Sequence, residues 1–198
     1  MKKGLIVLVG LVIIGVILVS WGTGKYNGFV EKEETVNQAW SQVENVYQRR
    51  YDLIPNLVET VKGYAKQEQE VFIEVTNARS RVGGMVNISP DVLNDPAQLA
   101  NFQQAQSSLG AALQRLLLVV ERYPDLKSDK NFRDLQVQLE GTENRITVER
   151  RRFNEVVQNY NTNVRRFPDS IFAGIFGFSK KSYFQMESGA DKAPKVQF

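Results

Sequence analysis

Apolar positions follow two different patterns along the chain. Near the amino terminus, residues 4 to 21 read GLIVLVGLVIIGVILVSW, a stretch of 18 residues without a charge. As an α-helix this stretch spans about 27 Å, enough to cross the hydrocarbon core of a bilayer. From Trp40 onward, apolar residues instead recur at alternating steps of three and four, the heptad spacing of packed helices. The sequence therefore predicts one membrane-spanning helix followed by an all-α domain.

Three long helices are expected in this domain, because no segment shows sustained alternation of period two. The first covers about residues 28–82, the second covers 96–123 after a loop at 83–95, and the third covers 129–167. Asp95 is expected to cap the second helix, and Ser128 or Asp129 the third. Short connections favour an antiparallel, coiled-coil-like bundle of three to four helices. The chain then divides into an anchor at 1–24, a bundle at 25–168 and an aromatic tail at 169–198.

Pro55 stands in the middle of the first predicted helix. It lacks the amide that would bond the Tyr51 carbonyl, so a kink or a break is expected there. At the standard helical rise the second helix, about 40 Å long, returns only to the level of Pro55. The earlier stripe residues Trp40, Val43 and Tyr47 then lack a partner within the chain, unless the tail folds back over them. A second copy is the simplest supplier of that partner, which predicts a homo-oligomer.

The amino-terminal segment has two interpretations. Lys2 and Lys3 precede the apolar run, as they would in a cleaved signal peptide. The run is longer than a usual signal peptide core and no small-residue cleavage site follows it, which favours an uncleaved single span. With Lys25 and Lys32 on the other flank, the charge balance favours an amino terminus in the cytoplasm and a bundle outside the bacterial inner membrane.

Composition excludes several kinds of chemistry. The chain has no Cys and no His, which excludes disulfides, thiolate zinc sites, cysteine nucleophiles and histidine-based catalytic triads. The 25 Lys and Arg against 22 Asp and Glu are not clustered on one face, so nucleic acid is not an expected partner. No cofactor is expected and the protein is predicted not to be an enzyme. A carboxylate-dependent hydrolase is the distant alternative, and it would need two convergent, desolvated carboxylates.

Several blocks of the sequence resemble the bacterial LemA family. They include QRRYDLIPNLVETVKGYA at 48–65, ERYPDLK at 121–127, FRDLQVQLEGTENRI at 132–146, FGF at 176–178 and the closing APKVQF. The resemblance covers nearly the whole chain. It implies a single-pass membrane protein with a mainly helical domain and no assigned reaction, and some relatives are associated with building bacterial internal membranes.

Charged residues interrupt the stripe of the first helix at Arg50 and Glu68. Such residues are expected to pair inside the bundle and to fix its register. Antiparallel alignment places Glu68 near Arg145, and Arg49 or Arg50 near the aspartates of the 124–130 turn. The carboxylates of the third helix, which alternate with arginines, favour solvated ion pairs over a metal site. They are Glu140, Glu143 and Glu149.

The tail FPDSIFAGIFGFSKKSYF, residues 167–184, is rich in aromatic side chains, among them Phe172, Phe176 and Phe178. It either packs on the bundle and the membrane-proximal part of the first helix, or contacts a neighbour or the bilayer interface. These features are compatible with two functions. One is a non-enzymatic, self-associating scaffold that organises membrane or partner proteins. The other is an adaptor for a membrane protease or envelope-stress system, binding through this tail or through the RRYDLIP region with Arg49, Arg50, Asp52 and Pro55.

Overall fold

The computed structural model describes residues 2–85 and 89–185, and every regular element in these ranges is helical. The long helices are α1 (Lys2–Tyr64), α2 (Gln69–Gly83), α3 (Pro96–Val120) and α5 (Lys130–Arg165). Shorter elements connect or follow them: the 3₁₀ helix η1 (Pro90–Asn94), α4 (Pro124–Ser128) and α6 (Asp169–Phe176). The predicted all-α fold with a long amino-terminal apolar helix is confirmed.

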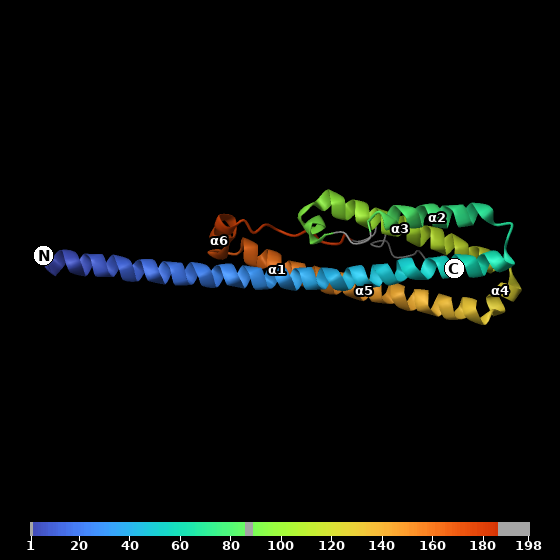
Figure 1. Ribbon diagram of the computed structural model, residues 1–198, viewed down its shortest axis with the longest axis horizontal. Helices are drawn as coiled ribbons and strands as arrows, with labels where there is room; N and C mark the ends of the chain where they lie inside the picture. The colour runs from blue at the N-terminus through green and yellow to red at the C-terminus, as the bar shows by residue number, and fades with distance from the viewer. Residues whose placement is uncertain (1, 86–88, 186–198) are drawn as a thin grey trace, which may run out of the picture.

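Four helices form the bundle, arranged as two antiparallel pairs. α1 extends from the amino terminus through the full length of the bundle, and α5 runs back alongside it (Figure 1). α2 and α3 form the second pair, which lies on the first. The apolar amino-terminal part of α1 projects beyond the bundle, and its side chains from Leu8 to Val19 are exposed apart from the half-buried Gly10.

The first predicted helix is wrong in one respect, because it breaks after Tyr64 and does not continue to residue 82. The chain turns over residues 65–68, where the Glu68 amide donates to the Ala65 carbonyl at 3.0 Å. The turn brings the stripe of α2 back onto α3. Had the helix continued straight, Phe72, Val75 and Val82 would extend past the end of the bundle; instead all three are buried.

Pro55 does not break α1, which remains helical through it, so the expectation of a break at this residue is wrong. The Tyr51 carbonyl, which has no Pro55 amide to accept from, lies 3.5 Å from Arg79 Nε on α2. The Arg79 guanidinium also stacks on the Tyr51 ring at 3.9 Å. Gly83 completes the contact, since a Cβ there would lie 2.9 Å from the Tyr51 hydroxyl. α2 therefore supplies the interaction that a proline in mid-helix removes.

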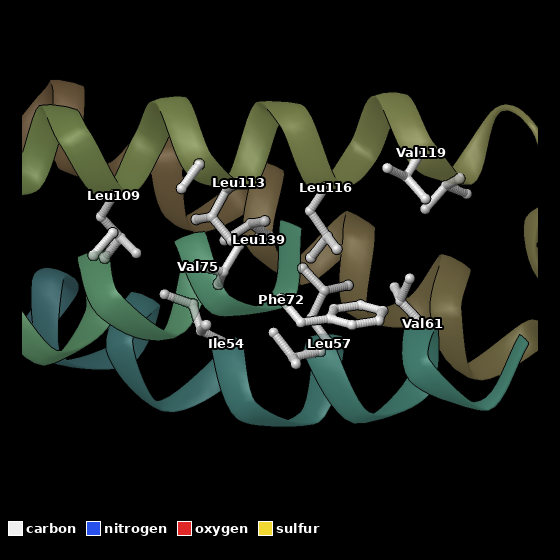
Figure 2. Packing of buried hydrophobic residues seen from close by; sticks show 14 of the residues in the cluster. Ile54, Leu57, Val61, Phe72, Val75, Leu109, Leu113, Leu116, Val119 and Leu139 are labelled. Carbon is white, nitrogen blue, oxygen red and sulfur yellow. The ribbon is translucent and has the colours of Figure 1, made fainter. Parts of the chain in front are cut away.

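The bundle has two apolar cores. One lies in the half farther from the apolar amino-terminal segment, which we call the membrane-distal half. Side chains from α1, α2, α3 and α5 converge in it, as Figure 2 shows. Each of these helices buries a stripe rather than a single contact, which is the packing expected of heptad-patterned helices. The residues labelled in Figure 2 are Ile54, Leu57, Val61, Phe72, Val75, Leu109, Leu113, Leu116, Val119 and Leu139.

A second core fills the membrane-proximal half and corrects the expectation of an unpartnered stripe. Trp40, Val43 and Tyr47 are buried within this one chain, with Trp40 fully inaccessible. α5 is long enough to cover them, and η1, α3 and the tail close the remaining sides. This core therefore does not require a second copy. Its residues are Phe29, Val36, Ala39, Trp40, Val43, Tyr47, Val92, Leu93, Leu99, Phe102, Ile146, Phe153, Val157, Tyr160, Val164, Ala173 and Phe184.

Side-chain caps begin the two helices as predicted. Asp95 Oδ1 accepts from the amides of Ala97 and Gln98 at 2.9 and 3.2 Å at the start of α3. Asp129 Oδ1 accepts from the Phe132 amide at 2.8 Å at the start of α5. These bonds satisfy amides that have no partner within the helix.

Candidate functional site at the membrane-proximal end

The aromatic tail packs on α1 where the apolar segment ends. Phe172 meets the Trp21 ring edge-on at 4.8 Å, and Phe176 meets Tyr26 at 5.3 Å. Phe178 packs on Phe29 with ring centroids 5.1 Å apart. The predicted tail residues Phe172, Phe176 and Phe178 are thus brought together, each on an aromatic residue of α1. We call this group of six rings the aromatic collar.

An ion pair fixes α6 at the same level. Lys25 Nζ lies 2.6 Å from Asp169 Oδ1, which joins the first charged residue after the apolar run to the first residue of α6. Gly177, with φ of 80°, ends α6 in the left-handed conformation, and the Phe178 amide donates back to the Ala173 carbonyl at 2.9 Å. This turn directs Phe178 onto α1, because glycine adopts a positive φ without strain.

The extended segment after α6 is held by side chains of α5. Asn161 donates to the Lys181 carbonyl and accepts from the Lys181 amide, both at 2.9 Å. Asn154 forms the same pair of bonds with Phe184, at 3.0 and 2.9 Å. Phe184 then stacks on Trp40 with centroids 5.9 Å apart. The two asparagines act as backbone partners for a segment that has no other regular structure, so we call residues 178–184 the tail strap.

Lys181 is the buried charge of this region. Its Nζ lies 2.6 Å from Glu33 Oε1 and donates to Asn94 Oδ1 at 2.9 Å, joining the tail strap to both α1 and η1. Burial, and to a lesser extent the Glu33 charge, raises the pKa of the neighbouring Tyr160 phenol well above its usual range. The phenol is therefore neutral at neutral pH, and its ring contributes to the packing of this core.

Arg50 is the second buried charge, and it separates the two cores. Its guanidinium donates to both Glu143 oxygens, at 2.9 and 3.2 Å, and to the carbonyl and side-chain oxygens of Gln106. It also lies 5.3 Å from the centroid of the Tyr47 ring. The expectation that Arg50 pairs inside the bundle is thus met, but with Glu143 of α5 rather than with the aspartates of the 124–130 turn. The reason is register, since Tyr64 instead occupies that level and donates to Asp129 at 3.2 Å.

The predicted contact between Glu68 and Arg145 is wrong. Glu68 accepts from Arg122 and from the Tyr123 hydroxyl at 3.0 and 3.1 Å, at the membrane-distal end of the bundle. The break after Tyr64 places it there, whereas Arg145 lies exposed on α5 beside the level of the Arg50–Glu143 pair.

RRYDLIP offers little free surface to a partner. Arg50 and Ile54 of this block are buried, and Pro55 is half-buried. Asp52 is exposed and accepts from Gln48 on its own helix at 2.7 Å. Arg49 is also exposed. The block therefore serves mainly the interior of the bundle.

A shallow pocket of about 230 Å³ lies between α1 and the α2–α3 pair, lined in part by Trp40, Glu44 and Phe102. Partial burial raises the pKa of Glu44, and a hydrogen bond from Trp40 opposes this rise. Glu44 is the one carboxylate among the residues that line the pocket, so this pocket does not provide the two convergent acids that hydrolysis would need. Within residues 2–85 and 89–185, no three acidic side chains gather as a metal site would require.

The sequence predicts that Arg50 is buried and paired, but it does not predict the residues with which Arg50 pairs. Glu143 and Gln106 gave no signal as partners of Arg50, because their pairing depends on the register between helices far apart in sequence. Asn154 and Asn161, seven residues apart on α5, did carry a signal: asparagine is a poor helix former, and two on one face of a helix point to a backbone that they bind.

Comparison with known proteins supports the expected family. The sequence model of the LemA family matches residues 39–198. The magnetosome proteins MamQ 1 and MamQ 2 of Paramagnetospirillum magneticum are each 28% identical over 186 residues, covering 84% of this chain and 67% of theirs. Protein LemA of Metamycoplasma hominis is 24% identical over 162 residues, covering 82% of this chain and 69% of its own.

Among the described residues, one helix is long and apolar enough to cross a membrane, and it is α1, through its amino-terminal part. The aromatic collar and the tail strap fasten the bundle to this same helix directly after the apolar segment. The chain belongs to the LemA family, as a membrane protein whose helical bundle is continuous with its candidate span.

Proposed function

We propose that this protein is a non-enzymatic, membrane-anchored scaffold that self-associates and organises membrane or partner proteins. The observation that carries the proposal is the continuity of α1, one helix of 63 residues that includes both the apolar segment and one side of the bundle. At the standard rise it is about 95 Å long. A bundle built on such a helix holds its surfaces at a fixed distance from the bilayer, which is a property that a scaffold needs.

Fastening by the tail adds to this support. Without the tail, only α5 would support α1 between the Trp40 level and the apolar segment. The Lys25–Asp169 and Glu33–Lys181 ion pairs, with the aromatic collar between α1 and α6, hold that stretch on two sides. These contacts join charged and aromatic side chains of the same chain, so they make the membrane-proximal end of the bundle rigid.

Self-association is the part of the proposal that the core does not demand, since the Trp40 stripe is buried within one chain. We argue for self-association from the number of binding surfaces that a scaffold needs. A single anchored bundle presents one copy of each surface, whereas organising several proteins requires at least two linked surfaces. Two relatives are magnetosome proteins by name, and an organising role at a membrane is our extension from them to this chain. The flanking lysines favour a bundle on the outer side of the bacterial cytoplasmic membrane.

The test uses two full-length copies with different affinity tags, produced together in one cell. After mild solubilisation, capture of one tag is expected to recover the other tag along with several membrane proteins. The matched control mixes membranes from cells that each make one tagged copy, and this mixture should recover only the captured tag. A single defined partner at a fixed ratio, without the second tag, would favour the adaptor function. Recovery of the captured copy alone at every protein concentration contradicts the scaffold.

A further inference from the structure

An exposed apolar surface remains on the tail after all the contacts within the chain are made. Ile175 is 70% exposed, Ile171 is 52% exposed and Phe167 is 78% exposed. Ile171 and Ile175 are four residues apart on α6 and therefore share one face, and Phe167 lies two residues before the helix. The neighbouring side of α6, about 100° around the helix, carries Phe172 and Phe176 onto the aromatic collar. The apolar surface of α6 is thus wider than the side that packs on α1, which is unusual for a surface helix of a water-soluble domain.

The position of α6 identifies what covers this surface. α6 lies against α1 at Trp21, Lys25 and Tyr26, directly where the apolar segment ends. Figure 1 shows it beside α1 at the end of the bundle nearer the amino terminus. Trp and Tyr rings are enriched at this level of membrane proteins, where the acyl chains meet the headgroups. The exposed face of α6 is therefore continuous with the surface that the candidate span presents to lipid.

Charges around α6 match a bilayer with anionic lipid. Asp169 is neutralised by Lys25, which leaves no free acidic residue within the helix itself. Arg165 and Arg166, at the end of α5, and Lys180, after α6, are exposed on either side of it. Apolar side chains flanked by basic ones are the pattern of a helix that lies in the interface, where each basic residue gains from negative headgroups.

We propose that α6 and Phe167 form a second membrane contact, lying in the interface of the same bilayer that α1 crosses, with Phe167, Ile171 and Ile175 against the acyl chains. Together with the span, this contact gives the protein two points of attachment. A single helix sets the height of the bundle above the bilayer but leaves the bundle free to tilt. The second contact restricts that tilt, so the bundle stands at one angle to the membrane surface.

The absence of Cys from the chain makes a direct test possible, because single cysteines can be introduced and labelled without background. Ile175→Cys carries an environment-sensitive nitrobenzoxadiazole label in the full-length protein, reconstituted into vesicles of equal parts phosphatidylcholine and phosphatidylglycerol. Leu11→Cys in the span is the positive control. Leu118→Cys and Val137→Cys are matched negative controls, since these apolar residues are as exposed as Ile175 but lie on the bundle. Brominated lipids then quench any label that touches the acyl chains.

The expected result is a blue-shifted emission from the Ile175 label and a loss of emission in brominated vesicles close to that of the Leu11 label. The two bundle labels should show neither effect. Emission and quenching equal to those of the Val137 label would overturn the proposal. A blue shift without quenching by lipid would also overturn it, because a protein surface, such as a second copy, would then be covering α6.

A second variant separates lipid contact from a general effect on folding. With the label at Phe167→Cys, replacing both Ile171 and Ile175 by Glu should reduce quenching to the level of the bundle labels, while the far-ultraviolet circular dichroism stays unchanged. Charged side chains are costly in the acyl region, so the helix should leave it. The same double replacement with the label at Leu11 should leave quenching as it was. Unchanged quenching of the Phe167 label in the double variant would contradict the proposal.

Discussion

Pro55 shows how a single residue is tolerated where its type is unfavourable. A proline inside a helix removes one hydrogen bond and crowds the preceding turn, at a cost of about 3 kcal/mol in an isolated helix. Here the Tyr51 carbonyl that loses its partner is approached by Arg79 from α2, at the limit of hydrogen-bonding distance. The stacking of Arg79 on the Tyr51 ring adds an attraction of its own. The contact that compensates for the proline thus also joins α1 to α2.

This arrangement predicts coupling between Arg79 and Pro55. Arg79→Ala should lower the free energy of unfolding by about 2 kcal/mol, from the lost hydrogen bond and the lost stacking. In a Pro55→Ala background the helix regains the Tyr51 bond through its own amide, so the same change should cost about 1 kcal/mol less. Chemical denaturation of the four proteins in mild detergent measures the cycle. Equal costs in the two backgrounds would show that Arg79 does not serve the proline.

Arg50 is expected to matter far more than its neighbour. Only 4% of the residue is exposed, and its removal leaves the Gln106 oxygens without their donor. Arg50→Ala should reduce the free energy of unfolding by about 3 kcal/mol, with part of the loss avoided because Glu143 is 44% exposed and can be hydrated. Arg49→Ala, on the exposed side of the same turn, should change it by less than about 0.5 kcal/mol. Similar losses in both variants would exclude a special role for the buried pair.

At the scale of the elements, the tail strap closes the membrane-proximal core. Phe184 is buried against Trp40 and Phe153, whereas its neighbour Tyr183 is 42% exposed. Phe184→Ala should cost about 3 kcal/mol of unfolding free energy, because it leaves a cavity beside Trp40. Tyr183→Ala serves as the control and should cost less than about 1 kcal/mol. Intrinsic Trp fluorescence during denaturation reports the change, and an equal effect of the two substitutions would mean that the tail is not part of the core.

The cap of α3 gives the bundle a dependence on acid. Hydrogen bonds from the Gln98 and Ala97 amides and from the Gln98 side chain lower the pKa of Asp95 below its usual value of 3.8. Since the folded pKa is the lower one, the cap stabilises the fold fully above the unfolded pKa and stops doing so as pH falls through the folded pKa. Asp95→Asn keeps a capping side chain but does not titrate. Its Tm should therefore fall less than that of the natural chain between neutral pH and about pH 3. Parallel Tm curves would contradict this account.

The helical class and most helix ends could be predicted from the sequence, while the path of the chain between helices could not. Heptad spacing identifies buried stripes, and Pro96 with Asp95 fixes the start of α3. The turn at residues 65–68 reads Ala-Lys-Gln-Glu, four good helix formers, and Gly63, two residues before it, is a weak local signal. The chain turns there because α2 packs on α3. That one turn then shifts the register on which the predicted partners of Arg50 and Glu68 depended.

For the whole molecule, the consequence of these contacts is a bundle that cannot move independently of its candidate span. α1 belongs to both, and α5, α6 and the tail strap support it from the apolar segment to the distal turn. The span, the aromatic collar and the two cores follow one another along a single helix. This continuity is the basis of the scaffold proposal, because a flexible joint anywhere along α1 would leave the surfaces of the bundle without a fixed height above the bilayer.

Pulsed electron paramagnetic resonance on the full-length protein in vesicles tests this continuity most directly. Spin labels at Gly24→Cys and Glu59→Cys lie on exposed positions of α1, just after the apolar segment and beyond Pro55. An unbroken helix between them predicts a single narrow distance distribution centred at about 52 Å. Dilution with unlabelled protein removes distances between copies. A broad distribution, or one centred well below that distance, would show a hinge or a break in α1 and would contradict the account.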